Sequence, residues 1–390
     1  MKKLLFVHDH PFYKQTNGEV FTGGSFPKEL WNNYLINFQE INVFARDSKS
    51  PNSKNGISST KNVSFYLTKN YSSAIDAIKN YRKIKQELKV LIEKADVVLV
   101  RLPSVLGFIA AELAFKMNKK VWVEQVGNAE EALGNHGSLL GKVAAPFFEY
   151  QNKKIVKRAN FVSYVTENKL QKDYPTHPQA ITVALSNVII NSILEKQGLK
   201  QERFSGDIFK IGLIGGFDAK YKGQDILLKA ISLLEENIKS NIKIYLVGKG
   251  DYSWVLNLAR RLNLIENIEY IGGLEAGNQI NDFLSTLSLY VQPSFTEGMP
   301  RATIEAMAMG CPVIGSNVGG IPDIVSKKFV HQRGNAQELS NHIKQLYLDR
   351  EILIQESTLS LKKAVPYLKE NLDKKRQEFY SLMNERLIDE

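Results

Sequence analysis

The sequence predicts an α/β protein made of two doubly wound domains, and three observations support this fold class. The chain has 390 residues, 43% of them apolar, which is too long for one ordinary core and suits two domains of middling size. Short runs rich in Val, Ile and Leu recur along the chain, and segments of helical length separate most of them. This alternation starts again after a polar stretch over residues 186–204. Continuous apolar strands that alternate with helices indicate parallel sheets covered on both faces.

The first half contains seven candidate strands and forms the first predicted domain, residues 1–190. The strands are expected at Leu4–Val7, Ile41–Ala45, Val63–Leu67, Val97–Val100, Val121–Val123, Phe161–Val165 and Ile181–Leu185. Apolar residues recur at helical spacing in two of the intervening segments, namely Leu30, Tyr34, Leu35 and Phe38, and Ile84, Leu88, Leu91 and Ile92. A hinge is expected near Asn187–Ser192, where the chain is polar and lacks periodicity.

The second half forms the second predicted domain, residues 191–365. Its candidate strands are Phe209–Ile214, Ile242–Val247, Ile268–Ile271, Leu287–Gln292 and Pro312–Gly315. The helix after the first strand has one apolar stripe, formed by Ile226, Leu227, Ala230, Ile231 and Leu234. A last helix over 366–390 is expected to begin at Pro366, because proline is tolerated in a first helical turn. Its apolar side is formed by Leu368, Leu372, Phe379, Leu382 and Met383.

Composition argues against a membrane-spanning or secreted protein. The longest apolar stretch, Val105–Phe115, contains Glu112 and is far shorter than the roughly 20 residues that cross a bilayer. Only Leu4–Val7 follows the basic start, whereas a secretory signal needs about 7–15 apolar residues. The single cysteine, Cys311, excludes an intrachain disulfide and fits a reducing compartment. A cytoplasmic protein is therefore expected.

The charge is distributed unevenly between the two halves. Residues 1–190 contain 26 Lys and Arg against 16 Asp and Glu, a net charge of +10, whereas residues 191–390 contain 25 of each. The excess predicts that the two halves face different partners. Scattered solvated lysines are the alternative interpretation.

Two glycine turns of the second half follow strands, and ligands of doubly wound sheets bind at the carboxyl ends of strands. In the first turn, Gly215 and Gly216 precede Lys222, which lies at a helix start where an anion is favoured. A surface lysine at a helix start is the alternative. The second turn, Gly248-Lys249-Gly250, lacks a third glycine at Ser253, so it is not a dinucleotide fingerprint and a hydride-transfer enzyme is disfavoured.

A third loop, Pro293–Pro312, carries two glutamates eight positions apart. Glu297 is expected on the loop, where it can accept hydrogen bonds from sugar hydroxyls, and Glu305 on the following helix, where it can accept both hydroxyls of a ribose. Gly298 lets backbone N–H groups reach the ligand. A capped helix with two exposed acids is the alternative, but Glu305 lies in the otherwise apolar segment Ile304–Met309, where an unpaired charge is costly.

The segment from Glu297 to Gly320 resembles the signature of retaining glycosyltransferase family 4, which has the GT-B fold. The Lys222-Gly223 loop, the Gly248–Gly250 turn and the Gly23-Gly24 pair match this family as well, so the resemblance covers nearly the whole chain and is strongest over 209–325. It implies two Rossmann-like domains with parallel sheets that face each other across a cleft. The donor would bind the C-terminal domain and the acceptor the N-terminal one, and the last helix would cross back onto the N-terminal domain.

Site residues follow from this resemblance. Glu305 corresponds to the ribose ligand, Glu297 to the residue that contacts the transferred sugar, and Lys222 to the lysine of the diphosphate. Many members have an arginine where this chain has Gly216, so Arg301 or Lys249 is a candidate replacement. The full set expected at the donor comprises Gly23, Gly24, Gly215, Gly216, Lys222, Gly248, Lys249, Gly250, Glu297, Gly298, Met299, Pro300, Arg301 and Glu305. Residues 124–127 and 164–167 resemble a subgroup associated with surface polysaccharides.

The expected reaction is metal-independent hexosyl transfer from a nucleotide diphosphate sugar, with retention of anomeric configuration and no cofactor. The sequence has no Asp-x-Asp motif, so cationic groups of the protein are expected to stabilise the departing diphosphate. Lys222 and Glu297 are the catalytic candidates. His136 is a candidate for the acceptor side, as are His8 and His10 after the first strand. In each case the alternative is a histidine on a loop or at a strand end that has no functional role.

The expected acceptor is a lipid-linked or polysaccharide precursor. Lysines cluster at 79–85 and 153–158, interleaved with apolar residues at helical spacing, which predicts peripheral docking on the anionic inner face of the cell membrane. The rival interpretations are a nucleotide-sugar epimerase or phosphorylase with the GT-B fold, a nucleic-acid-binding protein, and a non-catalytic nucleotide-sugar-binding scaffold. No nucleic-acid-binding motif is present in the sequence.

Overall fold

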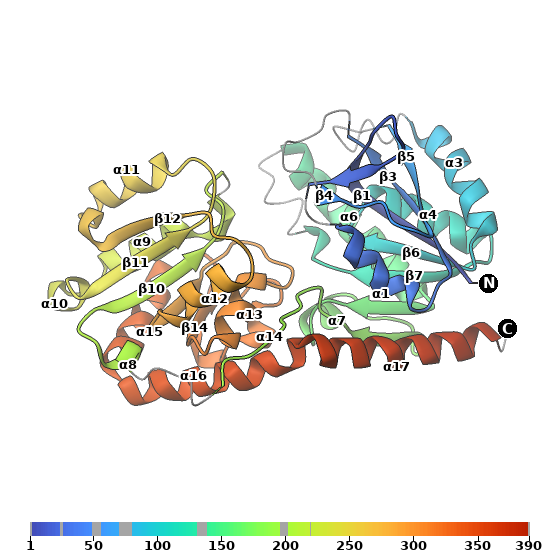
Figure 1. Ribbon diagram of the computed structural model, residues 1–390. Helices are drawn as coiled ribbons and strands as arrows, with labels where there is room; N and C mark the ends of the chain where they lie inside the picture. Colours follow the sequence, from blue (N-terminus) through green and yellow to red (C-terminus); the bar gives the residue numbers. More distant parts are fainter. Residues whose placement is uncertain are drawn as a thin grey trace. The chain divides into compact units, whose positions relative to one another are not determined.

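A computed structural model describes residues 2–23, 26–48, 56–69, 80–130, 139–195, 202–218 and 220–388, and it contains two compact units (Figure 1). The first unit comprises Met1–Val165, Leu170–Ala184 and Gln377–Glu390, and the second comprises Thr166–Lys169 and Leu185–Arg376. The main passage from the first unit to the second, at 184–185, lies close to the hinge expected near Asn187–Ser192.

The sheet of the first unit contains all seven expected strands. The central strand β1 (Lys3–Lys14) lies between β3 (Glu40–Asp47) and β6 (Val97–Leu102), and both pair with it in parallel. β5 (Val63–Thr68) continues the sheet beyond β3, and the other side continues with β7 (Lys120–Gln125), β8 (Phe161–Tyr164) and β9 (Ile181–Ala184). Neighbours on the two sides of β1 come from different parts of the chain, so β1 and β6 flank the topological switch point of this sheet.

Three details of the first unit differ from the sequence-based prediction. Strand β1 continues past Val7, with a register shift between Val7 and Pro11, and its end pairs antiparallel with β2 (Val20–Thr22), which pairs with β4 (Gly56–Ile57). The helix expected over Leu30–Phe38 is one turn of 3-10 helix, η1 (Lys28–Trp31), followed by α1 (Asn32–Leu35). β2 and β4 were not predicted because strands of two or three residues have no measurable periodicity. The helix is short because β3 already begins at Glu40, which leaves little room for a longer one.

Alternate residues of the first sheet face two different layers. Leu4, Phe6, Val97, Leu99 and Trp122 belong to one buried cluster, which also contains aromatic residues from η1 and α1. The opposite face is covered by α3 (Tyr81–Lys94), α4 (Val105–Lys116) and α6 (Leu139–Arg158). Because both faces are buried, the strands are continuous apolar runs rather than alternating ones.

The second unit has an all-parallel sheet of order β12-β11-β10-β13-β14-β15. Its strands are β10 (Phe209–Ile214), β11 (Ile242–Val247), β12 (Ile268–Gly272), β13 (Leu289–Gln292), β14 (Val313–Ser316) and β15 (Val330–His331), of which only β15 was not predicted. The order reverses between β10 and β13, so these two strands flank the switch point.

Helices of the second unit fall into two packed groups. α9 (Gln224–Ser232) contacts α11 (Ser253–Arg261) and α15 (Ala336–Leu348), whereas α13 (Arg301–Ala308) contacts α12 (Asn278–Ser285) and α16 (Arg350–Ala364). The shorter elements are α7 (Lys169–Asp173), which starts in the second unit and ends in the first, α8 (Glu202–Ser205), η3 (Lys220–Lys222), α10 (Glu236–Lys239), η4 (Ile265–Asn267), α14 (Ile321–Ile324), η5 (Lys327–Phe329) and η6 (Val365–Tyr367).

The last helix, α17 (Lys369–Ile388), begins in the second unit and ends in the first. Phe379, Tyr380 and Met383 are buried in the aromatic cluster of the first unit, and the ring centroid of Phe379 lies 5.5 Å from that of Trp122. The expected return of this helix to the N-terminal domain is therefore confirmed. Pro366 does not start it but lies in η6, so the proline separates α16 from α17. None of the helices in the described ranges is long and apolar enough to cross a membrane.

Candidate active site

The candidate site lies where β10 and β13 end, on either side of the switch point of the second sheet. The chain leaves β10 through Gly215 and reaches Lys222 at the end of η3, immediately before α9. It leaves β13 through Pro293 and reaches Glu297 on the loop before α13. Carboxyl ends of parallel strands meet at one edge of a sheet, and the switch point opens a crevice there. Lys222 and Glu297 are thus brought together from positions 75 residues apart in the sequence.

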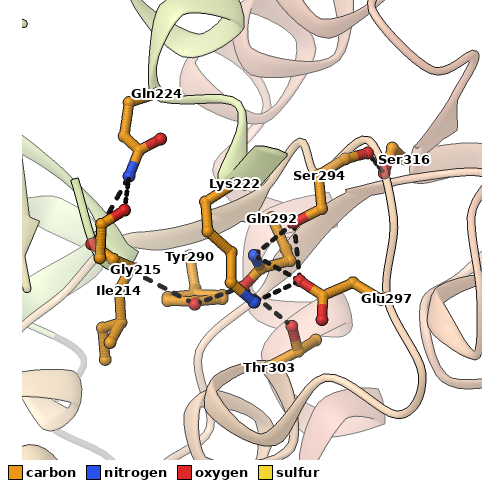
Figure 2. A network of polar contacts seen from close by, with 11 residues as sticks. Ile214, Gly215, Lys222, Gln224, Tyr290, Gln292, Ser294, Glu297, Thr303 and Ser316 are labelled. Atoms are coloured by element: carbon orange, nitrogen blue, oxygen red, sulfur yellow. Dashed lines mark hydrogen bonds and ion pairs between the residues drawn. The ribbon is translucent and has the colours of Figure 1, made fainter. Parts of the chain in front are cut away.

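Lys222 and Glu297 form an ion pair, and the two side chains point toward each other in Figure 2. Nζ of Lys222 donates to Oε1 of Glu297 at 2.6 Å, and the side chains are 20% and 8% exposed respectively. Two further donors reach the same oxygen, Ser294 Oγ at 2.7 Å and Gln292 Nε2 at 3.3 Å. In the part of the chain that the structure describes, the three hydrogen bonds of this carboxylate all go to Oε1. Oε2 therefore remains free to accept a hydrogen bond from a ligand.

A buried polar network holds Glu297 in place. Gln292 Oε1 accepts from the Tyr290 hydroxyl at 2.7 Å, and its Nε2 donates to Ser294 Oγ at 2.8 Å. Ser316, at the end of β14, donates to the Ser294 carbonyl at 2.6 Å. Burial raises the pKa of Tyr290 well above its ordinary value, so its hydroxyl stays a donor. Gln292, Ser294 and Tyr290 were not among the residues selected from the sequence, although Gln292 ends an apolar strand and Ser294 follows it, a position that could have pointed to them.

The two glycine turns predicted for the donor lie against each other. The Gly215 amide donates to the Val247 carbonyl and the Phe217 amide to the Lys249 carbonyl, each at 2.8 Å. The buried side chain of Gln224 donates to the Gly216 carbonyl at 3.1 Å, which fixes this turn to the start of α9. Lys249 is exposed, but only its main-chain carbonyl oxygen lies near Gly216, 3.5 Å from where a Cβ of that residue would be, and its side chain runs along Gly273.

Two glycines permit the loops around the ion pair to approach closely. Gly223 has φ of +77°, and a Cβ there would lie 2.1 Å from the Pro293 carbonyl oxygen. Gly319 has φ of +52°, and a Cβ there would lie 2.0 Å from the carbonyl oxygen of Glu297. Both positions combine a backbone conformation that L residues avoid with contact against main-chain atoms. The loops that carry Lys222 and Glu297 can therefore approach their neighbours this closely only because positions 223 and 319 are glycines.

Glu305 lies on α13, in the first turns after the Glu297 loop. Its Oε1 accepts from Arg301 Nε at 2.9 Å, and the Glu305 side chain is 14% exposed whereas that of Arg301 is 63% exposed. Arg301, proposed from the sequence as a cation for the diphosphate, is thus engaged by Glu305. Of the neighbouring predicted residues, Met299 and Pro300 are buried, and the Gly298 carbonyl accepts from the Gly320 amide at 2.7 Å.

The first unit has a polar cluster at the carboxyl edge of its own sheet. Asp9 lies in the register shift of β1 between Val7 and Pro11; its carboxylate accepts from the amides of Val105 and Leu106 at 2.6 and 2.9 Å, and so caps α4. His8 lies near the Arg101 carbonyl at 3.2 Å and His10 lies 2.7 Å from the Thr22 hydroxyl. Burial lowers the pKa of His8 to about 3 and that of His10 to about 4, so both imidazoles are neutral at pH 7.

The remaining predicted residues have varied positions. Gly23 follows β2 in the first unit, whereas Gly24 and His136 lie outside the described residues. Within the described ranges, no group of three or more His, Cys, Asp or Glu side chains is arranged to hold a metal ion.

Comparison with known sequences identifies relatives over the whole chain. Residues 199–366, which include the ion pair and Glu305, match the family of glycosyl transferases group 1. Protein CapJ of Staphylococcus aureus is 34% identical over 391 residues, covering 99% of this chain and 96% of CapJ. The capsular polysaccharide biosynthesis glycosyltransferase CapH of S. aureus is 39% identical over 100 residues, covering 25% of this chain and 27% of CapH.

Comparison with solved structures shows the fold. A sucrose-phosphate synthase from Thermosynechococcus elongatus covers 99% of this chain and 100% of its own with a TM-score of 0.69 and 14% identity. HepE of Anabaena, solved in complex with UDP, has the same coverage with a TM-score of 0.66 and 15% identity. The predicted two-domain GT-B fold is thereby confirmed. Together with the family match and the relative that spans the chain, this leads to one conclusion: the protein is a glycosyltransferase and belongs to the group 1 glycosyltransferases.

Proposed function

We propose that this glycosyltransferase transfers a hexose from a nucleotide diphosphate sugar, with the donor held by the second unit. The observation that carries this proposal is the Lys222–Glu297 pair at the switch point between β10 and β13. Ligands of doubly wound sheets bind at the switch point, and the bond that breaks joins the diphosphate to the sugar. The lysine can stabilise the anionic diphosphate, and the carboxylate can accept hydrogen bonds from the sugar. HepE, similar in fold, has been solved with UDP and with UDP-glucose, which supports this class of donor.

The proposed roles follow from the contacts in Figure 2. Glu297 Oε2 accepts a hydrogen bond from a hydroxyl of the transferred sugar, while Oε1 stays with Lys222, Ser294 and Gln292. Lys222 Nζ, which is partly exposed, is shared between Glu297 and the diphosphate as negative charge develops on the leaving group. We propose retention of configuration by attack on the same face of the sugar, with the leaving phosphate accepting the proton of the acceptor hydroxyl.

A direct test of this function combines binding and turnover. Nucleotides and nucleotide sugars that bind the native state raise its melting temperature, and the rise grows with the ratio of ligand concentration to Kd, so a thermal-shift panel at equal concentrations selects the donor. The selected donor is then incubated with and without candidate acceptors. Transfer that requires an acceptor supports the proposal. Release of an isomerised sugar from donor alone supports an epimerase, and the absence of stabilisation by every nucleotide sugar contradicts the proposed donor class.

Glu305 provides the first prediction, because its carboxylate is the candidate ligand of the ribose hydroxyls. We expect Glu305→Ala to weaken nucleoside diphosphate binding at least about tenfold, since a ribose would lose a charge-assisted acceptor for its hydroxyls. Isothermal titration with the selected nucleotide measures the effect. Arg301→Ala is the companion variant, because it removes the partner of Glu305 and keeps the carboxylate. Unchanged affinity of Glu305→Ala would contradict this assignment of the ribose site.

Metal independence is the second prediction. It rests on the absence of Asp-x-Asp from the sequence and on the cation that Lys222 supplies. We expect full transferase activity after exhaustive treatment with EDTA and passage over a chelating resin. Loss of activity that magnesium or manganese restores would show that a divalent ion, and not Lys222 alone, stabilises the departing diphosphate.

The proposed acceptor is a lipid-linked or polysaccharide precursor, bound by the first unit at the inner face of the cell membrane. Two observations support it. CapH, which is similar over a quarter of this chain, is a glycosyltransferase of capsular polysaccharide biosynthesis. The net charge of +10 lies in residues 1–190, and such an excess favours an anionic surface as partner.

A further inference from the structure

Helix α6 (Leu139–Arg158) presents large apolar side chains to solvent. Val143 is 75% exposed, Phe147 60% and Tyr150 65%. Their spacing of four and then three residues places them on one stripe of the helix. Three such side chains on a single helical face form a contiguous apolar surface, unlike the singly scattered exposed residues that are normal for soluble proteins.

Basic residues continue this stripe in the second half of α6. Lys153, Lys157 and Arg158 are exposed, and their positions on the helix fall on the same side as Phe147 and Tyr150. The opposite side of α6 is buried, because Ile155 and Val156 are fully inaccessible. Ile155 and Val156, the apolar residues within the basic cluster at 153–158, therefore belong to the core. The exposed apolar residues of α6 lie one to three turns before this cluster.

The acids near these cations lie deeper than the cations themselves. Glu149 accepts from Lys153 at 3.0 Å with side-chain exposures of 13% and 52%. Glu112, from α4, contacts Lys154 at 2.7 Å and Arg158 at 3.5 Å, with exposures of 29%, 39% and 44% respectively. Ion pairs at this level of exposure are weak, so the cations can exchange these partners for others. The outer surface of the C-terminal half of α6 is thus positive.

We propose that the outer face of α6, defined by Val143, Phe147, Tyr150, Lys153 and Lys157, is the surface that docks on an anionic lipid bilayer. This face combines one valine and two aromatic side chains with lysines, as helices that bind at a membrane interface do. The apolar side chains would insert at the boundary between headgroups and acyl chains, and the lysines would interact with the lipid phosphates. The charge complementarity and the +10 excess of this half favour anionic lipid over a protein partner. The inference rests on the proposed membrane-associated acceptor and names the element that makes the contact.

The first experiment uses an environment-sensitive label on α6. The single native cysteine, Cys311, is fully buried, and burial raises the pKa of its thiol to about 12, so an NBD reagent modifies an introduced cysteine selectively. Phe147→Cys reports on the proposed face and Leu348→Cys, at a 63% exposed position of the second unit, is the matched control. With full-length protein and phosphatidylglycerol vesicles, we expect a blue shift and a several-fold rise in emission for the first label alone. Equal responses of the two labels, or none, would overturn the proposal.

The second experiment removes the apolar stripe. We expect the triple variant Val143→Ser/Phe147→Ser/Tyr150→Ser to bind anionic vesicles at least about tenfold more weakly in co-sedimentation, and the Leu233→Ser/Leu348→Ser control to bind normally. Binding of the native chain should fall as salt rises and should be weak on neutral vesicles. Vesicle binding by the triple variant equal to that of the native chain refutes the inference.

Two further readouts separate the alternatives. If sedimentation velocity shows a dimer that the triple variant converts to a monomer, the face binds a second copy of the chain and not lipid. Nucleotide thermal shifts of the triple variant should match those of the native chain, because α6 belongs to the first unit and the candidate donor site to the second. Failure of nucleotide binding would refute the proposed function, whereas failure of vesicle binding would refute only the docking face.

Discussion

Replacement of Lys222 by alanine is expected to lower kcat by about 10²–10³-fold, because the variant loses the cation that faces the developing charge on the diphosphate. Glu297→Gln should lower kcat by a similar factor, since it removes the charge that positions Lys222 at 2.6 Å. The double variant should lose little more than either single variant, because two residues that act as a unit give non-additive losses. Steady-state rates with the donor selected by thermal shift measure all three.

The Lys222→Ala variant should remain folded. Ser294 and Gln292 still donate to Glu297 when the lysine is absent, so the carboxylate keeps two hydrogen bonds. Lys229→Ala is the control, because Lys229 forms a more exposed ion pair with Asp225 at 2.9 Å and, among the described residues, has no hydrogen bond or ion pair with Glu297, Gln292 or Ser294. Wild-type rates in Lys222→Ala and Glu297→Gln would refute the proposed active site. A loss in Lys229→Ala as large as in Lys222→Ala would point to a general effect of charge.

Gly223→Ala is expected to lower both stability and activity severely. The substitution places a Cβ 2.1 Å from the Pro293 carbonyl oxygen at a residue with φ of +77°, so the main chain of one loop or the other must move. The conformational cost alone is about 1–2 kcal/mol, and displacement of main-chain atoms adds to it. Because Gly223 follows Lys222 and Pro293 precedes the Glu297 loop, the movement separates the ion pair. We expect a loss of at least about 2 kcal/mol in the free energy of unfolding, together with a loss of turnover comparable to that of Lys222→Ala.

Gly272→Ala isolates the contribution of the clash. Gly272 has φ of +82°, and no atom lies within 4 Å of the position where its Cβ would be. It therefore has the same backbone strain in the same unit without the contact against the loop. Denaturant unfolding of both variants gives the difference in free energy, and transferase assays give the difference in rate. Equal effects of the two substitutions would show that the approach of the two loops does not depend on a glycine at position 223.

The sequence by itself determined the α/β class and nearly every strand of both sheets. Strands buried on both faces must be continuous apolar runs, and such runs are visible without any knowledge of tertiary contacts. β10 and β11 were predicted with their observed bounds for this reason. β2, β4 and β15 were missed because they have two or three residues, and pairing with distant strands, not local pattern, makes them strands.

Only the tertiary structure decided how the candidate site residues are combined. The sequence selected Lys222, Glu297 and Glu305 through a family pattern, but it did not show that Lys222 and Glu297 contact each other or that Arg301 is engaged by Glu305. Gln292 and Ser294 precede Glu297 by only a few residues, yet their hydrogen bonds to its Oε1, and the support that Tyr290 gives to Gln292, are seen only in the structure. Exposure was likewise undecided by the sequence: Phe147 and Val156 are both apolar residues of α6, yet one is 60% exposed and the other buried. Periodicity fixes which residues share a face, whereas the neighbouring elements decide which face is covered.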